Sequence, residues 1–240
     1  MEVPRWLERT DLLIGTEAIS KLQEANILIV GLGGVGSYAA EFLVRAGIGS
    51  VHMIDGDTVD ITNINRQMQA LNSTVGKSKV ALLEERFMDI NPCLKLTTYD
   101  KFLEPEVMEA LIRDYNFDYI LDCIDSVTPK LTLIQTAISV NARVISAMGA
   151  GGKLNPAKIR VGDISQTKEC KFARMVRKRL KRLGIREGIT AVYSEEVQPK
   201  SALEFTDGSN YKKSYYGTIS YMPALFGLTM AAEAVQRIIK

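Results

Sequence analysis

The stretch from Ile27 to Asp55 constrains the fold of this 240-residue chain more than any other part of it. Its first four residues, Ile27–Val30, are apolar and are followed at once by a glycine, which is typical of a buried parallel strand. A glycine-rich turn comes next, then a helical segment at Val35–Ala46 and a second apolar strand at Val51–Ile54. Strand, turn, helix and strand in this order predict two parallel strands joined by a helix.

The turn between the first strand and the helix has the composition of a phosphate-binding loop. Its glycines fit the pattern G-x-G-x-x-G with one extra glycine inside it: Gly31, Gly33, Gly34 and Gly36. Glycines let the main chain approach a phosphate closely, and the free N–H groups at the helix start favour an anion. Asp55, at the end of the second strand, is placed to accept hydrogen bonds from a ribose. The turn therefore predicts nucleotide binding, and by itself it leaves the nucleotide open.

The alternation of strands and helices continues beyond this unit. Apolar runs and helical spacing predict helices at 80–90, 106–114, 129–140 and 223–239, and strands at 94–99, 119–124, 144–147, 159–161 and 189–194. A helical segment at 5–24, broken at Gly15, is predicted from the spacing of Trp6, Leu12, Leu13, Ile19 and Leu22. We expect an α/β fold with a Rossmann-like, mostly parallel sheet, flanking helices and a C-terminal extension of short strands and helices. Residues 1–240 are expected to form a single domain.

Several polar residues are predicted to lie at the carboxyl edge of this sheet, where open α/β sheets bind ligands. Asn63 and Arg66 belong to a polar run at 61–67, and Lys79 on the first turn of the next helix is placed to reach a phosphate. Asp122 and Asp125 bracket the end of a strand, where an acid beside bound phosphates suits Mg²⁺.

A second glycine cluster, at Gly149–Gly152, follows the strand at 144–147, and Lys153 is expected to face the same edge.

The basic residues are unevenly distributed. Residues 168–186 hold nine of the 30 Lys and Arg residues and one of the 28 acids, so the rest of the chain is net negative by six. The stripe of Phe172, Val176, Leu180 and Leu183 predicts a helix that packs on the body. Its opposite face is expected to bind the backbone of a nucleic acid in a salt-dependent way. The cations predicted to do so are Lys171, Arg174, Arg177, Lys178, Lys181 and Arg182.

Other residue types exclude several kinds of site. The three cysteines lie far apart and form no C-x-x-C pair, which argues against a zinc ribbon or a disulfide framework. The single histidine, His52, lies within a predicted strand and is expected to be packed there and hydrogen-bonded. The N-terminus lacks the apolar core of a signal peptide, and the uncharged stretch at 214–232 contains glycines and a proline. We therefore expect a cytoplasmic protein with no membrane span.

Four motifs in order carry a resemblance to a known family: GLGGVGS at 31–37, IDGDTVDITNINRQ at 54–67, VGKSKV at 75–80 and DCIDSV at 122–127. Together they resemble the adenylating domain of the ubiquitin-activating superfamily, which includes the bacterial MoeB, ThiF and HesA proteins. The resemblance implies ATP and Mg²⁺ as cofactors and a homodimer with shared sites. By position it implies a ribose contact at Asp55, phosphate contacts at Asn63, Arg66 and Lys79, a metal-linked acid at Asp125, and an arginine inserted into the partner's ATP site at Arg9.

Within the superfamily the chain is most similar to the tRNA threonylcarbamoyladenosine dehydratase group, also called TcdA or CsdL. The marks are Gly149–Gly152, Asp163-Ile164, the basic helix and GTISYMPALFGL at 217–228. The resemblance implies transfer of AMP to the threonyl carboxylate of N6-threonylcarbamoyladenosine in tRNA, ring closure by the neighbouring ureido group, and binding of the anticodon arm by the basic helix. The chain departs from the group at Lys168–Lys171, where an Asp-Pro pair is expected.

Alternative functions stay open at this point, one of them also an adenylating enzyme and one of another class. An adenylating enzyme for a ubiquitin-like sulfur carrier would use Cys170 as thioester nucleophile, although relatives of that type usually hold zinc through two C-x-x-C pairs. A non-catalytic, nucleotide-dependent RNA-binding module is a third hypothesis. A nicotinamide-dependent dehydrogenase explains the glycine turn but leaves Asn63, Lys79 and the basic helix without a role. The sequence also leaves open a monovalent cation near Gly149 and the assistance of a cysteine desulfurase system.

Overall fold

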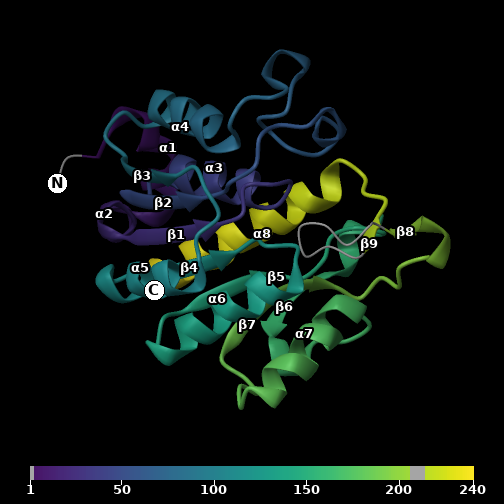
Figure 1. Ribbon diagram of the computed structural model, residues 1–240. Helices are drawn as coiled ribbons and strands as arrows, with labels where there is room; N and C mark the ends of the chain where they lie inside the picture. The colour runs from purple at the N-terminus through teal and green to yellow at the C-terminus, as the bar shows by residue number, and fades with distance from the viewer. Residues whose placement is uncertain (1–2, 206–213) are drawn as a thin grey trace.

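The computed structural model of the protein describes residues 3–205 and 214–240. Its centre is a seven-stranded sheet with the strand order β3-β2-β1-β4-β5-β7-β6 (Figure 1). All neighbouring strands are parallel except β6, which is antiparallel to β7 at one edge. The strands of this sheet are β1 (Asn26–Val30), β2 (Ser50–Ile54), β3 (Lys95–Tyr99), β4 (Tyr119–Asp122), β5 (Val144–Ala147), β6 (Ile159–Asp163) and β7 (Ile189–Ser194). The expected α/β fold with a mostly parallel sheet is confirmed.

Helices cover both faces of the sheet. They are α1 (Glu8–Ile14), α2 (Thr16–Glu24), α3 (Gly36–Ala46), α4 (Lys79–Ile90), α5 (Pro105–Asp114), α6 (Val127–Ser139), α7 (Lys171–Arg182) and α8 (Tyr221–Ile238). One buried apolar cluster joins one face of the strands to α2, α3, α4 and α8, and a second joins the other face to α5, α6 and α7. Because alternate residues of a strand point to opposite faces, neighbours such as Leu28 and Ile29 belong to different clusters.

The C-terminal extension contains a separate two-stranded antiparallel sheet, formed by β8 (Leu203–Phe205) and β9 (Ser214–Tyr216). Residues 206–213, between these two strands, lie outside the described residues. The helix expected at 223–239 is present as α8, which begins at Tyr221, and its buried residues belong to the apolar cluster on one face of the sheet. Among the described helices none is long and apolar enough to cross a membrane.

Three packing details differ from the sequence predictions. Helix α6 begins at Val127, so Pro129 lies within its first turn, where a missing N–H costs no intrahelical bond. Leu183 follows the end of α7 and is 47 % exposed, and Ala173 instead joins the buried stripe of that helix. In the N-terminal segment, Leu12 and Leu13 are 84 % and 83 % exposed. Their spacing did predict a helix, but no described residue covers them.

His52 is packed, as expected. Its ring lies edge-on to Tyr115 and Phe117, with ring centres 4.6 and 5.0 Å away. Burial lowers the pKa of this imidazole. Its Nδ1 atom has no hydrogen-bond partner among the described residues, so the expected hydrogen bond at that nitrogen is not formed. His52, which lies on β2 with its ring packed against these aromatic side chains, therefore has a structural role and is not placed to act as a catalytic base.

Candidate nucleotide site and basic face

The glycine turn between β1 and α3 permits close backbone packing that larger residues would prevent. Gly31 has φ +90°, in the left-handed region that favours glycine. A Cβ on Gly36 would lie 1.8 Å from the carbonyl oxygen of Gly31, so a side chain there would force the turn open. No side chain caps the start of α3. Apart from the N–H of Ser37, which donates to the Gly33 carbonyl at 3.1 Å, the first N–H groups of the helix are therefore available to an anion.

Asp55 links the end of β2 to the glycine turn. Its carboxylate is buried and accepts hydrogen bonds from the backbone N–H groups of Leu32 at 2.6 Å and Asp57 at 2.8 Å. Burial raises the pKa of this carboxyl group, against the opposing effect of Lys79 and of the two backbone hydrogen bonds. The structure thus places Asp55 beside the turn, as predicted. A ribose hydroxyl bound here would donate to the same Asp55 carboxylate oxygens that accept the two backbone hydrogen bonds.

The segment at 61–67 also reaches the glycine turn. A Cβ on Gly34 would lie 3.0 Å from the backbone oxygen of Arg66 and 3.3 Å from its Cγ, so Arg66 lies directly against the turn. Its guanidinium donates to the Thr62 carbonyl at 2.8 Å and to Asn65. Asn63 is buried, and its side-chain oxygen accepts from the backbone N–H of Asp60 at 3.2 Å. Arg66 can reach a ligand by a change of rotamer, whereas Asn63 is already part of a turn.

Lys79, at the start of α4, is buried and forms an ion pair with Asp57, with 2.8 Å between Nζ and the carboxylate. Asp57 is half-exposed, and Asp55 is close enough for its pKa to respond to the lysine. The sequence predicted a lysine facing phosphate. The structure shows one already neutralised by an acid of its own chain. A triphosphate at the glycine turn would compete with Asp57 for this ammonium group.

Asp122 and Asp125 have different environments although they lie three residues apart. Asp122 is fully buried, and one of its oxygens accepts from Lys130 Nζ and from Ser146 Oγ, each at 2.6 Å. Lys130 also donates to the carbonyl of Ala147 at 3.0 Å. Asp122 therefore has a structural role in the core. Asp125 is exposed and lies at the carboxyl edge, in the loop that follows β4.

The sequence analysis missed two polar contacts at this edge. One is the buried ion pair of Asp122 with Lys130. The sequence feature that could have predicted it is an acid at the end of a strand followed by a lysine on the first turn of the next helix. The other is Gln69, which is buried and donates from its side chain to the carbonyl of Leu32 at 2.7 Å. Both contacts fix main chain that borders the glycine turn. They position the site and do not face solvent.

The prediction for Lys153 was wrong. Its side chain is 1 % exposed, and its ammonium group donates to the carbonyl oxygens of Ser194 at 3.0 Å and Glu196 at 3.4 Å. Burial lowers its pKa. The glycine cluster before it is covered by the end of β9 and the segment that follows, because a Cβ on Gly151 would lie 3.0 Å from the Cβ of Tyr216 and 3.1 Å from the hydroxyl of Thr218. That segment also crosses to the segment at 61–67, where Asn65 donates to the Thr218 carbonyl at 2.9 Å.

Arg9 is not drawn into this cluster. It lies exposed on α1, which packs on α2 and on the short turn Arg5–Leu7, and no hydrogen bond or ion pair joins it to a described residue. Arg9 therefore lies apart from the other predicted site residues. Five of them lie around the glycine turn: Asp55, Asn63, Arg66, Lys79 and Asp125.

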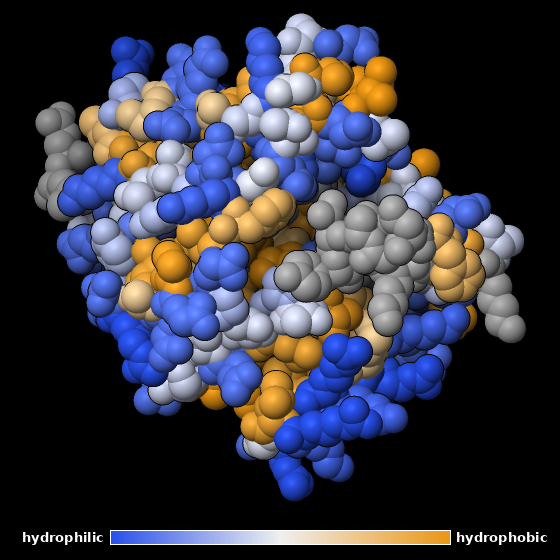
Figure 2. Space-filling view, in the orientation of Figure 1, coloured by the Kyte–Doolittle hydropathy of each residue, from blue (hydrophilic) through white to orange (hydrophobic). Residues whose placement is uncertain are grey.

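The basic helix is present, and most of its cations face solvent. Figure 2 shows hydrophilic side chains gathered over α7 at the lower right of the view. The exposed cations among those predicted to bind RNA are Lys171, Arg174, Lys178, Lys181 and Arg182. Arg177 differs, because its guanidinium donates to the Thr167 carbonyl at 2.8 Å and also to the hydroxyl of Thr167. Arg177 is thus occupied in holding the loop before α7.

Cys170 does not have the environment of a reactive thiol. It is 4 % exposed, and its sulfur caps α7 by accepting from the backbone N–H of Ala173 at 3.5 Å. A nucleophilic cysteine needs access to its substrate, which this position does not provide. The geometry therefore disfavours Cys170 as a thioester nucleophile.

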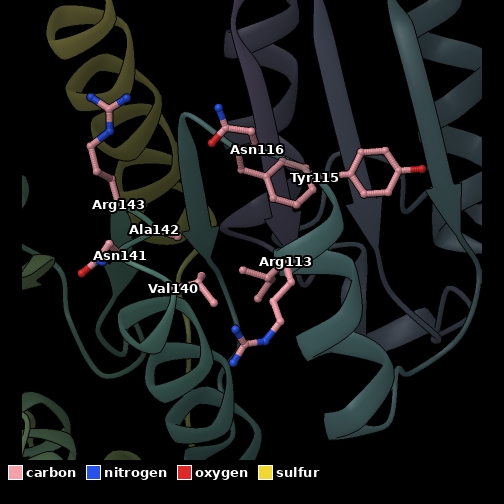
Figure 3. Close-up of a pocket in the computed structure, with 9 residues that line it drawn as sticks. Arg113, Tyr115, Asn116, Val140, Asn141, Ala142 and Arg143 are labelled. Atoms are coloured by element: carbon pink, nitrogen blue, oxygen red, sulfur yellow. The ribbon is translucent and has the colours of Figure 1, made fainter.

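A cavity of about 410 Å³ lies at the opposite, amino-terminal edge of the sheet (Figure 3). It is lined by the end of α5, by the turn that follows α5 and by the turn before β5, and Arg113 and Arg143 are among the lining residues. Both arginines are already paired with acids, Glu109 and Asp118. None of the predicted site residues lines this cavity, so its size does not make it the nucleotide site.

Comparisons with known proteins agree with this geometry. A tRNA threonylcarbamoyladenosine dehydratase of Bacillus subtilis is 35% identical over 239 residues, covering 97% of this chain and 94% of the relative. The crystal structure of the E. coli protein TcdA in complex with AMP has a TM-score of 0.87 at 33% identity, covering 98% of this chain and 96% of that chain. A structure of the same protein with ATP has a TM-score of 0.86.

Similarity to enzymes of another kind is only partial. An Aspergillus clavatus protein named adenylyltransferase and sulfurtransferase uba4 is 35% identical over 134 residues, which is 56% of this chain and 27% of the relative. The model of the ThiF family, in contrast, matches residues 8–240. That match spans the glycine turn, the segment at 61–67, the buried acid of β4 and the basic helix. The chain belongs to the ThiF family.

Proposed function

We propose that this protein is an ATP-dependent tRNA threonylcarbamoyladenosine dehydratase, which closes N6-threonylcarbamoyladenosine in tRNA to a cyclic form with loss of water. The observation that carries this proposal is the extent of the likeness: both the sequence and the fold of known dehydratases match from near one end of the chain to the other. The ATP and AMP complexes of the E. coli protein support ATP as the nucleotide. The basic face of α7 supports tRNA as the other substrate.

The reaction needs a leaving group on the carboxylate, since a carboxylate is a poor electrophile. A carboxylate oxygen attacks the α-phosphorus of ATP, pyrophosphate leaves, and an acyl adenylate forms. The neighbouring ureido group then attacks the activated carbonyl, and AMP leaves with that carboxylate oxygen. Arg66 and Lys79 are positioned beside the glycine turn to offset negative charge as it moves onto pyrophosphate. The backbone N–H groups at the start of α3 add to this stabilisation.

Mg²⁺ fits this site as an ion shared with the triphosphate. Asp125 is exposed in the loop after β4, and the backbone of Cys123 in that loop would lie 3.1 Å from a Cβ on Gly31. Over residues 3–205 and 214–240, no group of three or more His, Cys, Asp or Glu side chains could hold a metal without the substrate. Mg²⁺ is commonly bound by one or two carboxylates plus phosphates, where it neutralises phosphate charge. Asp125 is the carboxylate that would supply that contact.

The proposed activity has a direct product test. Purified protein, ATP, Mg²⁺ and tRNA that carries N6-threonylcarbamoyladenosine should give a nucleoside lighter by one water, read by mass spectrometry after digestion at neutral pH. The same tRNA without the threonylcarbamoyl group should leave ATP unconsumed above background. A nucleoside of unchanged mass, with ATP and a fully modified tRNA present, would contradict the proposal.

The two alternative functions have their own signatures in the same assay. Pyrophosphate exchange into ATP that is stimulated by a ubiquitin-like carrier protein, and not by tRNA, would indicate activation of a sulfur carrier. Tight binding of tRNA without any turnover of ATP would indicate a non-catalytic RNA-binding module. The partial match to the uba4 protein and the burial of Cys170 both weigh against the first of these.

We propose that the protein acts as a homodimer, with Arg9 completing the ATP site of the partner subunit. An exposed apolar face on and beside α1 supports this, because Trp6, Leu12 and Leu13 are 43 %, 84 % and 83 % exposed. Exposed apolar residues that form a contiguous patch mark an interaction surface. Arg9 is three and four residues from Leu12 and Leu13, so it lies on the same side of the helix. A partner bound to that face would receive the arginine.

Subunit mixing tests the contribution of Arg9. The variants Arg9→Ala and Asp125→Asn should each be inactive alone. If Arg9 acts on the partner, refolding the two together should restore about a quarter of the wild-type activity, since half of the dimers would be mixed and each would hold one intact site. No recovery, with mixed dimers verified by mass, would contradict a shared site. Leu13→Asp, which should yield monomers, provides the matched assembly control.

Three further features stay predictions: a monovalent cation near the Gly149–Gly152 cluster, assistance by a cysteine desulfurase system, and a cytoplasmic location. The cation is the one accessible to a simple measurement. Replacing potassium and sodium by a large organic cation at constant ionic strength should lower turnover if the site exists. Unchanged turnover would show that the reaction does not depend on a monovalent cation.

A further inference from the structure

A cavity of about 370 Å³ lies at the amino end of α7. Its wall is formed by the loop before the helix, the first turns of the helix and Val197. The lining contains one acid, Glu169, and four cations: Lys168, Lys171, Arg174 and Arg177. This α7 cavity, lined by Thr167–Lys171, Arg174, Arg177 and Val197, is at the small end of the volumes that hold ligands. It is large enough for a phosphate group with part of its sugar.

The charges around the α7 cavity are not neutralised within the described part of the chain. No ion pair with a described acid is formed by Lys168, Lys171 or Arg174. The helix cap is not a carboxylate either, because the residue that caps α7 is Cys170, where Asp, Asn, Ser or Thr is usual. The positive end of the helix dipole therefore points into a cavity already lined by cations.

The α7 cavity lies on the same edge of the sheet as the nucleotide turn. The first turn of α7 contacts the second glycine cluster, since a Cβ on Gly149 would lie 3.7 Å from Phe172. The opposite wall continues into Gln198, which donates to the Gly151 carbonyl at 2.7 Å. Strands β1, β4, β5 and β7 are neighbours about 4.8 Å apart, so the end of β7 lies roughly 14 Å from the glycine turn at the end of β1. A substrate bound at both places would be a short strand of nucleotides.

We propose that the α7 cavity binds one backbone phosphate of the RNA substrate near the reacting nucleoside, and that Lys171 and Arg174 make this contact. This inference rests on the proposed function and divides the basic face into two parts. The cations at the amino end fix the register of the RNA against the nucleotide edge. Those farther along the outer face, Lys178, Lys181 and Arg182, supply general attraction to phosphates. Arg177 shapes the wall through its hydrogen bonds to Thr167.

Two variants with equal loss of charge separate these roles. In the cavity variant Lys171 and Arg174 become glutamine, and in the outer-face variant Lys178 and Arg182 become glutamine. Each is titrated with anticodon stem-loops in which a single phosphodiester is replaced by an uncharged methylphosphonate, one linkage at a time. For wild type and the outer-face variant, one linkage close to the modified nucleoside should weaken binding by about ten- to a hundredfold, as expected for a lost charge-assisted hydrogen bond. The cavity variant should be insensitive to that linkage.

Several outcomes overturn the proposal. It fails if the cavity variant keeps the linkage sensitivity of wild type, or if no linkage stands out in wild type. Inorganic phosphate provides another contrary outcome. The proposal also fails if phosphate raises the melting temperature of wild type but not of the cavity variant, and no single RNA linkage affects binding, because the cavity then binds a free anion. A charge-conserving variant, Lys171→Arg with Arg174→Lys, should retain the sensitivity and thereby exclude misfolding. The binding titration requires no turnover. If the wild-type protein has no dehydratase activity but its RNA binding still depends on one linkage, only the dehydratase proposal is contradicted.

Discussion

Replacing Asp125 with asparagine is expected to lower kcat for AMP formation by about 10²- to 10³-fold, the usual size of the loss when one preorganised group that stabilises transition-state charge is removed. Asparagine keeps the shape of the side chain and removes its charge. Asp125 is exposed at the carboxyl edge, and substitutions at exposed positions usually change stability little. The rate is followed as tRNA-dependent pyrophosphate release at several Mg²⁺ concentrations.

The matched control for this variant is Asp114→Asn, an exposed acid at the end of α5. It should retain wild-type turnover. The affinity for tRNA should be the same for both variants, because the basic face is unchanged. A variant of Asp125 with normal turnover at limiting Mg²⁺ would remove this residue from the metal contact and from the mechanism.

The second large effect is expected from the buried ion pair below the site. Lys130→Met should lower the free energy of unfolding by about 3–5 kcal/mol, because it leaves the Asp122 carboxylate buried without its counter-charge. Lys130 and Asp122 are both fully buried, so solvent does not screen the loss. Urea denaturation followed by circular dichroism measures the change.

A double variant identifies the cause of that loss. Lys130→Met combined with Asp122→Asn removes both charges and should recover part of the stability lost in the single variant, since a neutral pair carries less desolvation cost. A single variant that costs less than about 1 kcal/mol, or a double variant less stable than the single, would show that the pair does not hold β4, β5 and α6 together as inferred.

The parts of the site that the sequence predicts are those set by local rules. The glycine turn, the strand before it and the acid after β2 follow from residue type and order, because backbone geometry at Gly31 and Gly36 admits almost no other residue. The strands of the parallel sheet are similarly evident from short apolar runs. Five predicted site residues lie around the turn for the same reason: the carboxyl ends of parallel strands share one edge.

The parts that the sequence does not predict depend on partners distant along the chain. Lys153 is buried because two carbonyl groups, one at the end of β7 and one just after it, accept hydrogen bonds from its ammonium group, and nothing in its own segment indicates them. Lys79 is neutralised by Asp57, and Arg177 is held by Thr167. Leu183 continues the apolar spacing of α7, but the helix ends one residue earlier and leaves it outside the stripe. A pattern of residue types shows which face is apolar and cannot show which long side chain finds a partner.

The measurement that tests the central claim most directly follows one oxygen atom. If the carboxylate of the threonyl group is labelled with ¹⁸O, adenylation places one of its oxygens on the phosphate of the AMP released. We predict that mass spectrometry will find AMP carrying one ¹⁸O in amounts equal to the nucleoside that has lost one water. Unlabelled AMP beside a dehydrated nucleoside, or ADP with labelled inorganic phosphate, would contradict carboxylate adenylation at this glycine turn.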